Sequence, residues 1–328
     1  MFKSPFLPSS SSPGHGSIHL SILPPSHPVL TAFTYQYPLK LISPDPYHLP
    51  TKSEQTVILV FLLAYGGGLV AGDQIHLSIT LEPTTRLALA TQGSTKLFKS
   101  PSKETVSRQT LDVTIGEGAG LSYLPDPTQP FDQSAYEQRQ MFKVAKGSSL
   151  AVLDWVSEGR RARGERWGLR VWKGINEVRS AESGRLMLRD SVVLDDGEGK
   201  VGRKGAEALE MKTDGMGIVG TLILYGPLFK GLGEYFLSEF GTLPRIGGRN
   251  WGAAEEIQIS AEERVRLERR NQEKADGLLW TAANVRGFVL VKFGALEVEG
   301  ARKWLGHMFR TEGSVTREFG EQAALSFR

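Results

Sequence analysis

Short segments in which apolar and polar residues alternate follow one another along most of the chain, and this pattern limits the fold more than any other feature. The segment 74–82 (QIHLSITLE) places its isoleucines and leucines on one face of a strand and its His, Ser and Thr on the other. Similar segments cover residues 17–22, 86–91, 105–115, 120–124, 136–144, 149–156, 165–172, 184–193 and 218–225. Each is bounded by Gly, Pro or Asp, and no helical periodicity separates them. The sequence therefore predicts a mainly β fold (a sandwich, barrel or β-solenoid) and argues against a doubly wound α/β fold.

Helical patterns begin only in the C-terminal part of the chain. A capping box at Ser260–Glu263 opens a charged stretch that predicts a helix reaching to about residue 283. A second helix is predicted over residues 295–309, with Trp304, Leu305 and Met308 on one apolar stripe. The sequence thus predicts a stacked, short-strand β-helical or sandwich-like core with two α-helices in its C-terminal half.

The length of 328 residues allows one large domain, which we expect from residue 16 to residue 328. Residues 1–15 are rich in Ser and Pro and have too little apolar surface to offset the entropy of ordering, so they are predicted to be a disordered tail. Residues 195–217 are polar and Gly-rich and are predicted to form a flexible loop. The helical part is expected at about 260–310.

The composition argues against several kinds of site. The chain has no cysteine, so it cannot form disulfides, zinc–thiolate sites or iron–sulfur clusters. Only His76 and His307 lie beyond the N-terminal fifth of the chain, and we expect no tightly held transition metal. The longest apolar run, residues 57–64, is far shorter than the ~20 residues that span a bilayer. No membrane association and a cytoplasmic location are therefore expected.

Two glycine-rich motifs have the spacing of phosphate-binding loops but not their context. The sequence GMGIVG at 215–220 is followed by a predicted strand, whereas a dinucleotide site needs a helix there. The sequence GGLVAG at 67–72 is followed by Asp73, and a carboxylate at that position would repel a phosphate. The glycines at 66–68 instead predict a turn with positive φ or a close backbone approach.

Three arginines stand between two glycines at residues 159–164, followed by Glu165 and Arg166. This cluster is interpreted either as a solvated turn or as a surface that binds phosphates or an acidic protein. Two other functions stay open on the residues alone. One is a β-solenoid carbohydrate-active enzyme, which would pair Asp or Glu carboxylates ~5–10 Å apart in a cleft. The other is a nucleic-acid binder centred on Arg160–Arg166, although no aromatic-rich stacking motif accompanies these arginines.

Four stretches, in order and with their spacing, resemble a known family. They are residues 34–44 (TYQYPLKLISP), 67–73 (GGLVAGD), 89–100 (LATQGSTKLFKS) and 159–165 (GRRARGE). In order and spacing they are similar to the urease accessory protein UreD family, called UreH in some bacteria, and the resemblance spans about residues 16–190.

The resemblance implies a non-enzymatic urease maturation factor, a nickel-binding chaperone with a β-rich fold. It implies binding to a UreF-like partner that recruits a UreG-like GTPase, and an assembly that engages apo-urease and inserts nickel, with an internal polar channel as the route. No nucleic acid partner and no tightly bound cofactor are implied, only the transient passage of Ni²⁺. The scarcity of Cys and His agrees with such a conduit, because oxygen ligands hold Ni²⁺ more weakly than thiolates or imidazoles do.

The resemblance also suggests roles for individual residues. The expected lining or support of the channel is Asp73, Ser94, Thr95 and Glu165. The expected structural motif residues are Gly67, Gly68, Gly72, Lys96 and Gly164. The expected partner-binding residues are Arg160, Arg163, Trp304, Leu305 and Met308.

Overall fold

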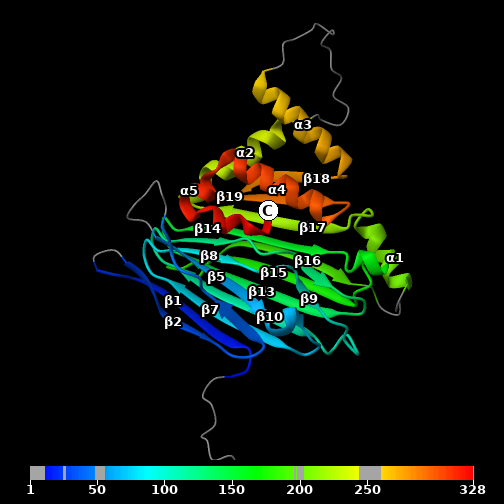
Figure 1. Ribbon diagram of the computed structural model, residues 1–328, viewed down its shortest axis with the longest axis horizontal. Coiled ribbons are helices and arrows are strands. Elements are labelled where there is room, and N and C mark those ends of the chain that lie inside the picture. Colours follow the sequence, from blue (N-terminus) through cyan, green and yellow to red (C-terminus); the bar gives the residue numbers. More distant parts are fainter. Residues whose placement is uncertain are drawn as a thin grey trace, which may run out of the picture.

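Two β-sheets lie face to face and make up most of the structure, a computed structural model that describes residues 12–24, 27–48, 56–195, 197, 203–243 and 260–327 (Figure 1). Sheet 1 has seven strands in the spatial order β16 (Leu186–Asp195), β15 (Val171–Ser180), β13 (Ala135–Val144), β10 (Ser107–Ile115), β7 (Gln74–Leu81), β1 (His15–Leu23) and β2 (His27–Tyr35). The mainly β fold that the alternating segments predict is confirmed.

Sheet 2 faces sheet 1 and continues beyond it towards the helices. Its main path has the order β18 (Leu279–Val285), β19 (Phe288–Ala295), β17 (Ile218–Tyr225), β14 (Ser149–Ser157), β11 (Gly120–Tyr123), β8 (Arg86–Ala90), β5 (Thr56–Ala64) and β3 (Leu39–Ile42). Four short strands lie off this path, namely β4 (Tyr47–His48), β6 (Gly68–Leu69), β9 (Thr95–Leu97) and β12 (Thr128–Pro130).

The chain coils between the sheets, and this explains why its strands are short and regularly repeated. It runs from β7 to β8 and β9, then from β10 to β11 and β12, and then from β13 to β14 and β15. Successive coils stack through parallel pairs, β7–β10–β13–β15 in sheet 1 and β8–β11–β14 in sheet 2. A third parallel ladder of β6, β9 and β12 closes one side. The arrangement is that of a short β-solenoid whose two main faces form a sandwich.

Two apolar layers hold these elements together. The inward side chains of β7, such as Leu77 and Ile79, are buried with those of sheet 2 in a core between the sheets. A second core lies on the other face of sheet 2, beneath the helices. The helices are α1 (Arg203–Lys212), α2 (Lys230–Gly241), α3 (Ala261–Ala275), α4 (Val298–Glu312) and α5 (Ser314–Phe319). Of the helices described, none is both long and apolar enough to cross a membrane.

The C-terminal half has more helices than the two predicted, and their bounds differ. The capping box is confirmed, since the Ser260 hydroxyl accepts from the Glu263 N–H at 3.1 Å and the Glu263 carboxylate accepts from the Ser260 N–H at 3.0 Å. The helix that it opens ends at Ala275, however, not near residue 283. Gly277 adopts a positive φ, and the β-branched and aromatic residues that follow form β18 and β19. Helix α2 was not predicted.

Two further predictions are wrong in their positions. The flexible loop predicted at 195–217 contains α1, whose Leu209 is fully buried in the core between the sheets. The strand predicted at 165–172 is a loop up to residue 170, and β15 begins at Val171. Trp167 has a positive φ, which interrupts a strand at that point. The first strand begins at His15, within the predicted tail, and residues 1–11 of that tail lie outside the described part of the chain.

Candidate functional site

Polar side chains occupy inward positions of sheet 1, where the neighbouring inward positions are apolar. In β13 both Gln138 and Gln140 are buried at such positions. Gln140 is in register with Asn176 on β15, and Asn176 is in register with Asp190 on β16. In-register neighbours share a face of the sheet, so Gln140, Asn176 and Asp190 form a polar row across sheet 1.

A second polar row faces the first from sheet 2. Asp154 on β14 is in register with Thr221 on β17, and Thr221 is in register with Lys292 on β19. Asp154 and Thr221 are buried, whereas the Lys292 side chain is 47% exposed. The Lys292 ammonium reaches across to sheet 1 and contacts the Asp190 carboxylate at 2.6 Å.

Asp154 lies at the centre of the contacts between the two rows. The Gln138 amide donates to its Oδ1 at 3.0 Å, and the Asn176 amide donates to its Oδ2 at 2.8 Å. Burial raises the pKa of Asp154 to about 6, although these two hydrogen bonds favour the ionised form. The carboxyl group therefore changes its protonation state close to neutral pH.

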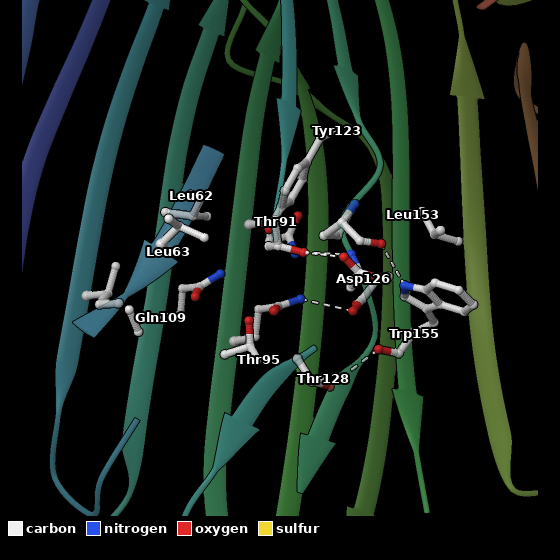
Figure 2. Close-up of a pocket in the computed structure, with 16 residues that line it drawn as sticks. Leu62, Leu63, Thr91, Thr95, Gln109, Tyr123, Asp126, Thr128, Leu153 and Trp155 are labelled. Carbon is white, nitrogen blue, oxygen red and sulfur yellow. Dashed lines mark hydrogen bonds between the residues drawn. The ribbon is translucent and has the colours of Figure 1, made fainter. Parts of the chain in front are cut away.

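A small cavity of about 20 Å³ lies beside Asp154 between the sheets, and Figure 2 shows the side chains that line it. A space of this size holds about one water molecule. Its lining is mixed, with Leu62 and Leu153 among the apolar residues and Thr91, Thr95 and Gln109 among the polar ones.

Asp126 is the second carboxylate on the wall of this cavity. Its Oδ2 accepts hydrogen bonds from the Gly93 N–H at 2.9 Å and from the Thr91 hydroxyl at 3.3 Å. Its Oδ1 accepts from the Arg302 guanidinium at 3.0 Å. Arg302 belongs to α4, so this ion pair connects the helical layer to the interior of the β core.

A second cavity has a volume of about 160 Å³. Asp154 also borders this cavity, together with Trp172, Val192, Thr221 and the half-exposed Lys292. Asp154 lines both cavities, so polar groups follow one another from Thr95 at the half-buried end of the first cavity to Lys292 at the surface. We call this set the polar interior; its members are Thr91, Thr95, Gln109, Asp126, Gln138, Gln140, Asp154, Asn176, Asp190, Thr221 and Lys292.

The donor groups of the polar interior suit a hard cation that is held only briefly. Carboxylate, amide and hydroxyl oxygens are present, but no thiolate or imidazole. Within the described residues, no group of three or more His, Cys, Asp or Glu side chains is arranged to hold a metal ion. The site can therefore solvate a cation in transit, and it lacks the compact ligand set of a storage site.

Of the four residues expected at a channel, only Thr95 lines the cavity between the sheets. Ser94 is its half-buried neighbour on the chain. The Asp73 carboxylate accepts from the Val70 N–H at 2.9 Å and so closes the turn that carries it. Glu165 pairs with Arg160, and this hydrogen bond lowers the pKa of Glu165. Asp73 thus bonds within its own turn, whereas Glu165 bonds to Arg160 of its turn and also accepts from the Asp132 N–H at 3.4 Å.

The residues expected to form a structural motif lie mainly in turns. Gly67 and Gly72 have positive φ, and Gly164 ends a short 3₁₀ turn in the left-handed conformation. A Cβ at Gly68 would lie 2.3 Å from the carbonyl oxygen of Lys96, so only glycine allows β6 to pair with β9 there. The Lys96 side chain itself is exposed.

The arginine cluster is largely neutralised by carboxylates nearby. Arg161 pairs with Glu297 at 3.1 Å, and Arg166 pairs with Glu158 at 2.6 Å. The Arg160 guanidinium lies 3.9 Å from the centre of the Phe131 ring and also bonds to Glu165. Arg163 is exposed, which leaves it accessible to a partner.

The apolar stripe of α4, expected to bind a partner, is buried within the chain. Trp304 is 4% exposed, and Leu305 and Met308 are fully buried. Trp304 packs against Phe293 of sheet 2 and Phe236 of α2. The helical periodicity of this stripe arises from burial in the core. These three side chains are therefore not accessible to a partner in this structure.

Most of the polar interior could not be recognised from the sequence pattern. Gln138, Gln140 and Asp154 lie in segments that were correctly predicted as strands, but their inward direction was not assigned. The clearest signal that was overlooked is Lys292, a single charge within the apolar stretch FVLVKFGA.

Comparison with known proteins gives a consistent result. The family described as UreD urease accessory protein matches residues 14–327. The chain is 31% identical over 280 residues to the "Uncharacterized urease accessory protein ureD-like" of Schizosaccharomyces pombe, covering 84% of this chain and 86% of that protein. It is 29% identical to "Urease accessory protein 4" of Cryptococcus neoformans, with 94% and 93% covered. "Urease accessory protein D" of Arabidopsis thaliana is 31% identical over 60% of this chain and 62% of its own length.

Proposed function

The chain belongs to the UreD urease accessory protein family, and from this premise we propose that it is a non-catalytic scaffold that helps to load nickel into apo-urease. In this proposal the chain binds a UreF-like protein, which recruits a UreG-like GTPase, and the assembly engages apo-urease. Nickel is the cargo of the assembly and passes through the polar interior. The assembly is cytoplasmic, in keeping with a chain that has no cysteine for disulfides.

The observation that carries this proposal is the position of Asp154 on the walls of both cavities. It joins oxygen donors that begin at Thr95 to those that end at Lys292. A divalent ion in an apolar interior would lose its hydration at a cost of tens of kcal/mol, so a route between two sheets needs polar walls. The Asp154 carboxylate, and the Asp190 carboxylate once it is released from Lys292, offset the charge of such an ion.

The kinds of donor atoms also support a passage rather than a resting place. Among first-row divalent ions, Ni²⁺ binds nitrogen and sulfur donors strongly, and it would be retained by a cluster of imidazoles or thiolates. The polar interior offers oxygen donors, which bind more weakly and so allow release to apo-urease. The absence of a nucleotide-binding motif in the sequence agrees with GTP hydrolysis by a partner.

A reconstituted activation assay tests the proposal. Apo-urease, the UreF-like protein and the UreG-like GTPase from the same organism are mixed with GTP and Ni²⁺, with and without this chain. We expect a stable complex that contains the chain and urease activity that depends on it. A folded chain that joins no complex, with equal urease activity in its absence, would refute the proposal. Turnover of a carbohydrate by the isolated chain would favour the enzymatic alternative.

A further inference from the structure

The solvent end of the polar interior is closed by an ion pair. The Lys292 ammonium lies 2.6 Å from Asp190 Oδ1 and 3.4 Å from the Thr221 hydroxyl. Lys292 is half exposed, whereas the Asp190 side chain is 9% exposed. The ammonium therefore stands between solvent and the carboxylate, on the border of the cavity that leads to Asp154.

On the interior side of this ion pair, three buried side-chain oxygen atoms accept no hydrogen bond. Asn176 Oδ1 and Asp190 Oδ2 have no hydrogen-bond partner, although both residues are more than nine-tenths buried. Gln140 Oε1, one strand away in the same polar row, is also unpartnered and buried. All three atoms are acceptors. Buried acceptors without a donor are costly, and a cation or an ordered water satisfies them.

The sheet register brings these atoms to one place. Asn176 and Asp190 are directly opposite each other on β15 and β16, where opposite Cβ atoms are ~5 Å apart. The Asn176 amide is bonded to Asp154 at 2.8 Å, so its unpartnered Oδ1 belongs to a group already in contact with that carboxylate. Gly174, two residues earlier, permits this packing, because a Cβ there would lie 3.0 Å from Asp154 Oδ2 and 2.5 Å from the Trp172 ring.

From this juxtaposition we propose that Asp154, Asn176 and Asp190 form a transient divalent-cation site and that the Lys292 ammonium is its built-in competitor. A divalent ion that enters from the Lys292 side displaces the ammonium from Asp190 and binds the carboxylate and amide oxygens behind it. When the ion leaves, the ammonium returns to Asp190. Lys292 is thus a positioning and gating residue for the nickel transfer proposed above, on which this inference rests.

Two physical properties suit an ammonium group to this role. It is a single charge with strong hydration, on a flexible side chain that reaches the solvent, so it can leave the carboxylate and return. It also neutralises Asp190 while the site is empty, which avoids an uncompensated charge in the interior. The ion pair thereby stabilises the site when no cation is bound and weakens the binding of the cation.

Calorimetric titration of the full chain with Ni²⁺ alone, at about pH 8 where Asp154 is ionised, tests the proposal. Replacing Lys292 by Met removes the competitor. We expect Ni²⁺ to bind this variant at least roughly tenfold more tightly than the wild type, because the loss of one charge-assisted hydrogen bond corresponds to a change in affinity of that size. Lys292→Arg keeps the positive charge and should keep the weak wild-type affinity. Lys303→Met, on the exposed surface of α4, is the matched control and should change nothing.

Adding Asp154→Asn to Lys292→Met should abolish the gain in Ni²⁺ affinity. This result would distinguish binding at the proposed site from binding to the histidines near the N-terminus. Circular dichroism verifies that each variant is folded. If Lys292→Met does not fold, Lys292→Gln replaces it, because glutamine removes the positive charge and can still donate a hydrogen bond to Asp190. Equal or weaker Ni²⁺ binding by the folded Lys292 variant, or a gain that survives Asp154→Asn, overturns the proposal. Failure of the activation assay with wild-type protein counts instead against the nickel-loading function.

Discussion

Replacement of Asp154 by Asn should make the protein more stable at neutral pH, although it changes a buried residue with two hydrogen bonds. Burial raises the pKa of this carboxyl from 3.8 to about 6. The folded state therefore favours the protonated form. The contribution of Asp154 to stability is fully present below about pH 4 and is lost as the pH rises through about 6.

The magnitude follows from the same two values. A pKa of about 6 in place of 3.8 corresponds to a penalty of about 3 kcal/mol above pH 7, at about 1.36 kcal/mol per unit. Asn cannot ionise and avoids this penalty. Its amide also finds an acceptor, because rotation of the Asn176 amide presents the unpartnered Oδ1 to it.

Urea unfolding followed by tryptophan fluorescence, from about pH 4 to about pH 8, measures the effect. We expect the free energy of unfolding of Asp154→Asn, relative to the wild type, to rise by about 2.5 kcal/mol across this range. Most of the rise should fall between about pH 4 and about pH 6, with its midpoint at about pH 5, between the pKa values of the unfolded and folded states. A difference that stays constant with pH would show that Asp154 titrates normally, and it would refute the description of this carboxyl as desolvated.

Two further predictions concern the helical layer. Leu305→Ala should destabilise the protein by about 2–5 kcal/mol, because this side chain of α4 is fully buried in the core between the helices and sheet 2. Urea unfolding measures the loss, and a change below about 1 kcal/mol would contradict its burial. Arg302→Met leaves Asp126 buried without its ion pair and should cost roughly 1.5–3 kcal/mol by the same assay, and adding Asp126→Asn should recover part of the loss. A double variant no more stable than Arg302→Met would show that the ion pair does not link α4 to the interior.

The strands could be predicted because their apolar faces alternate over many residues. In β7, Ile75, Leu77, Ile79 and Leu81 are all buried, as the period of two requires. The polar interior was harder to find. In β13 the run Glu137–Gln140 is polar on both faces, so the pattern does not reveal that Gln138 and Gln140 point inward. Only the sheet register shows their polar neighbours, Gln109 of β10 beside Gln138 and Asn176 of β15 beside Gln140.

Several residues expected at a channel or a partner surface contact other groups of the same chain. Asp73 bonds within its own turn, and Glu165 bonds to Arg160 and to the Asp132 N–H. The sequence cannot distinguish carboxylates of this kind from a channel lining. The stripe on α4 has the same periodicity whether it contacts a partner or the core, and Trp304 and Leu305 contact the core. Lys292 gains its significance from Asp190, about one hundred residues away along the chain.

The most direct test of the account is nickel transfer by a chain whose polar interior has been made apolar. Gln140→Leu removes a polar group from the wall at nearly constant volume, and Gln74→Leu changes an exposed glutamine of sheet 1 as the matched control. In the reconstituted activation assay, both variants should enter the complex as the wild type does. The account predicts that Gln140→Leu activates urease several-fold less and that Gln74→Leu activates it normally. Full activation by Gln140→Leu, at equal complex formation, would contradict passage of nickel through the interior.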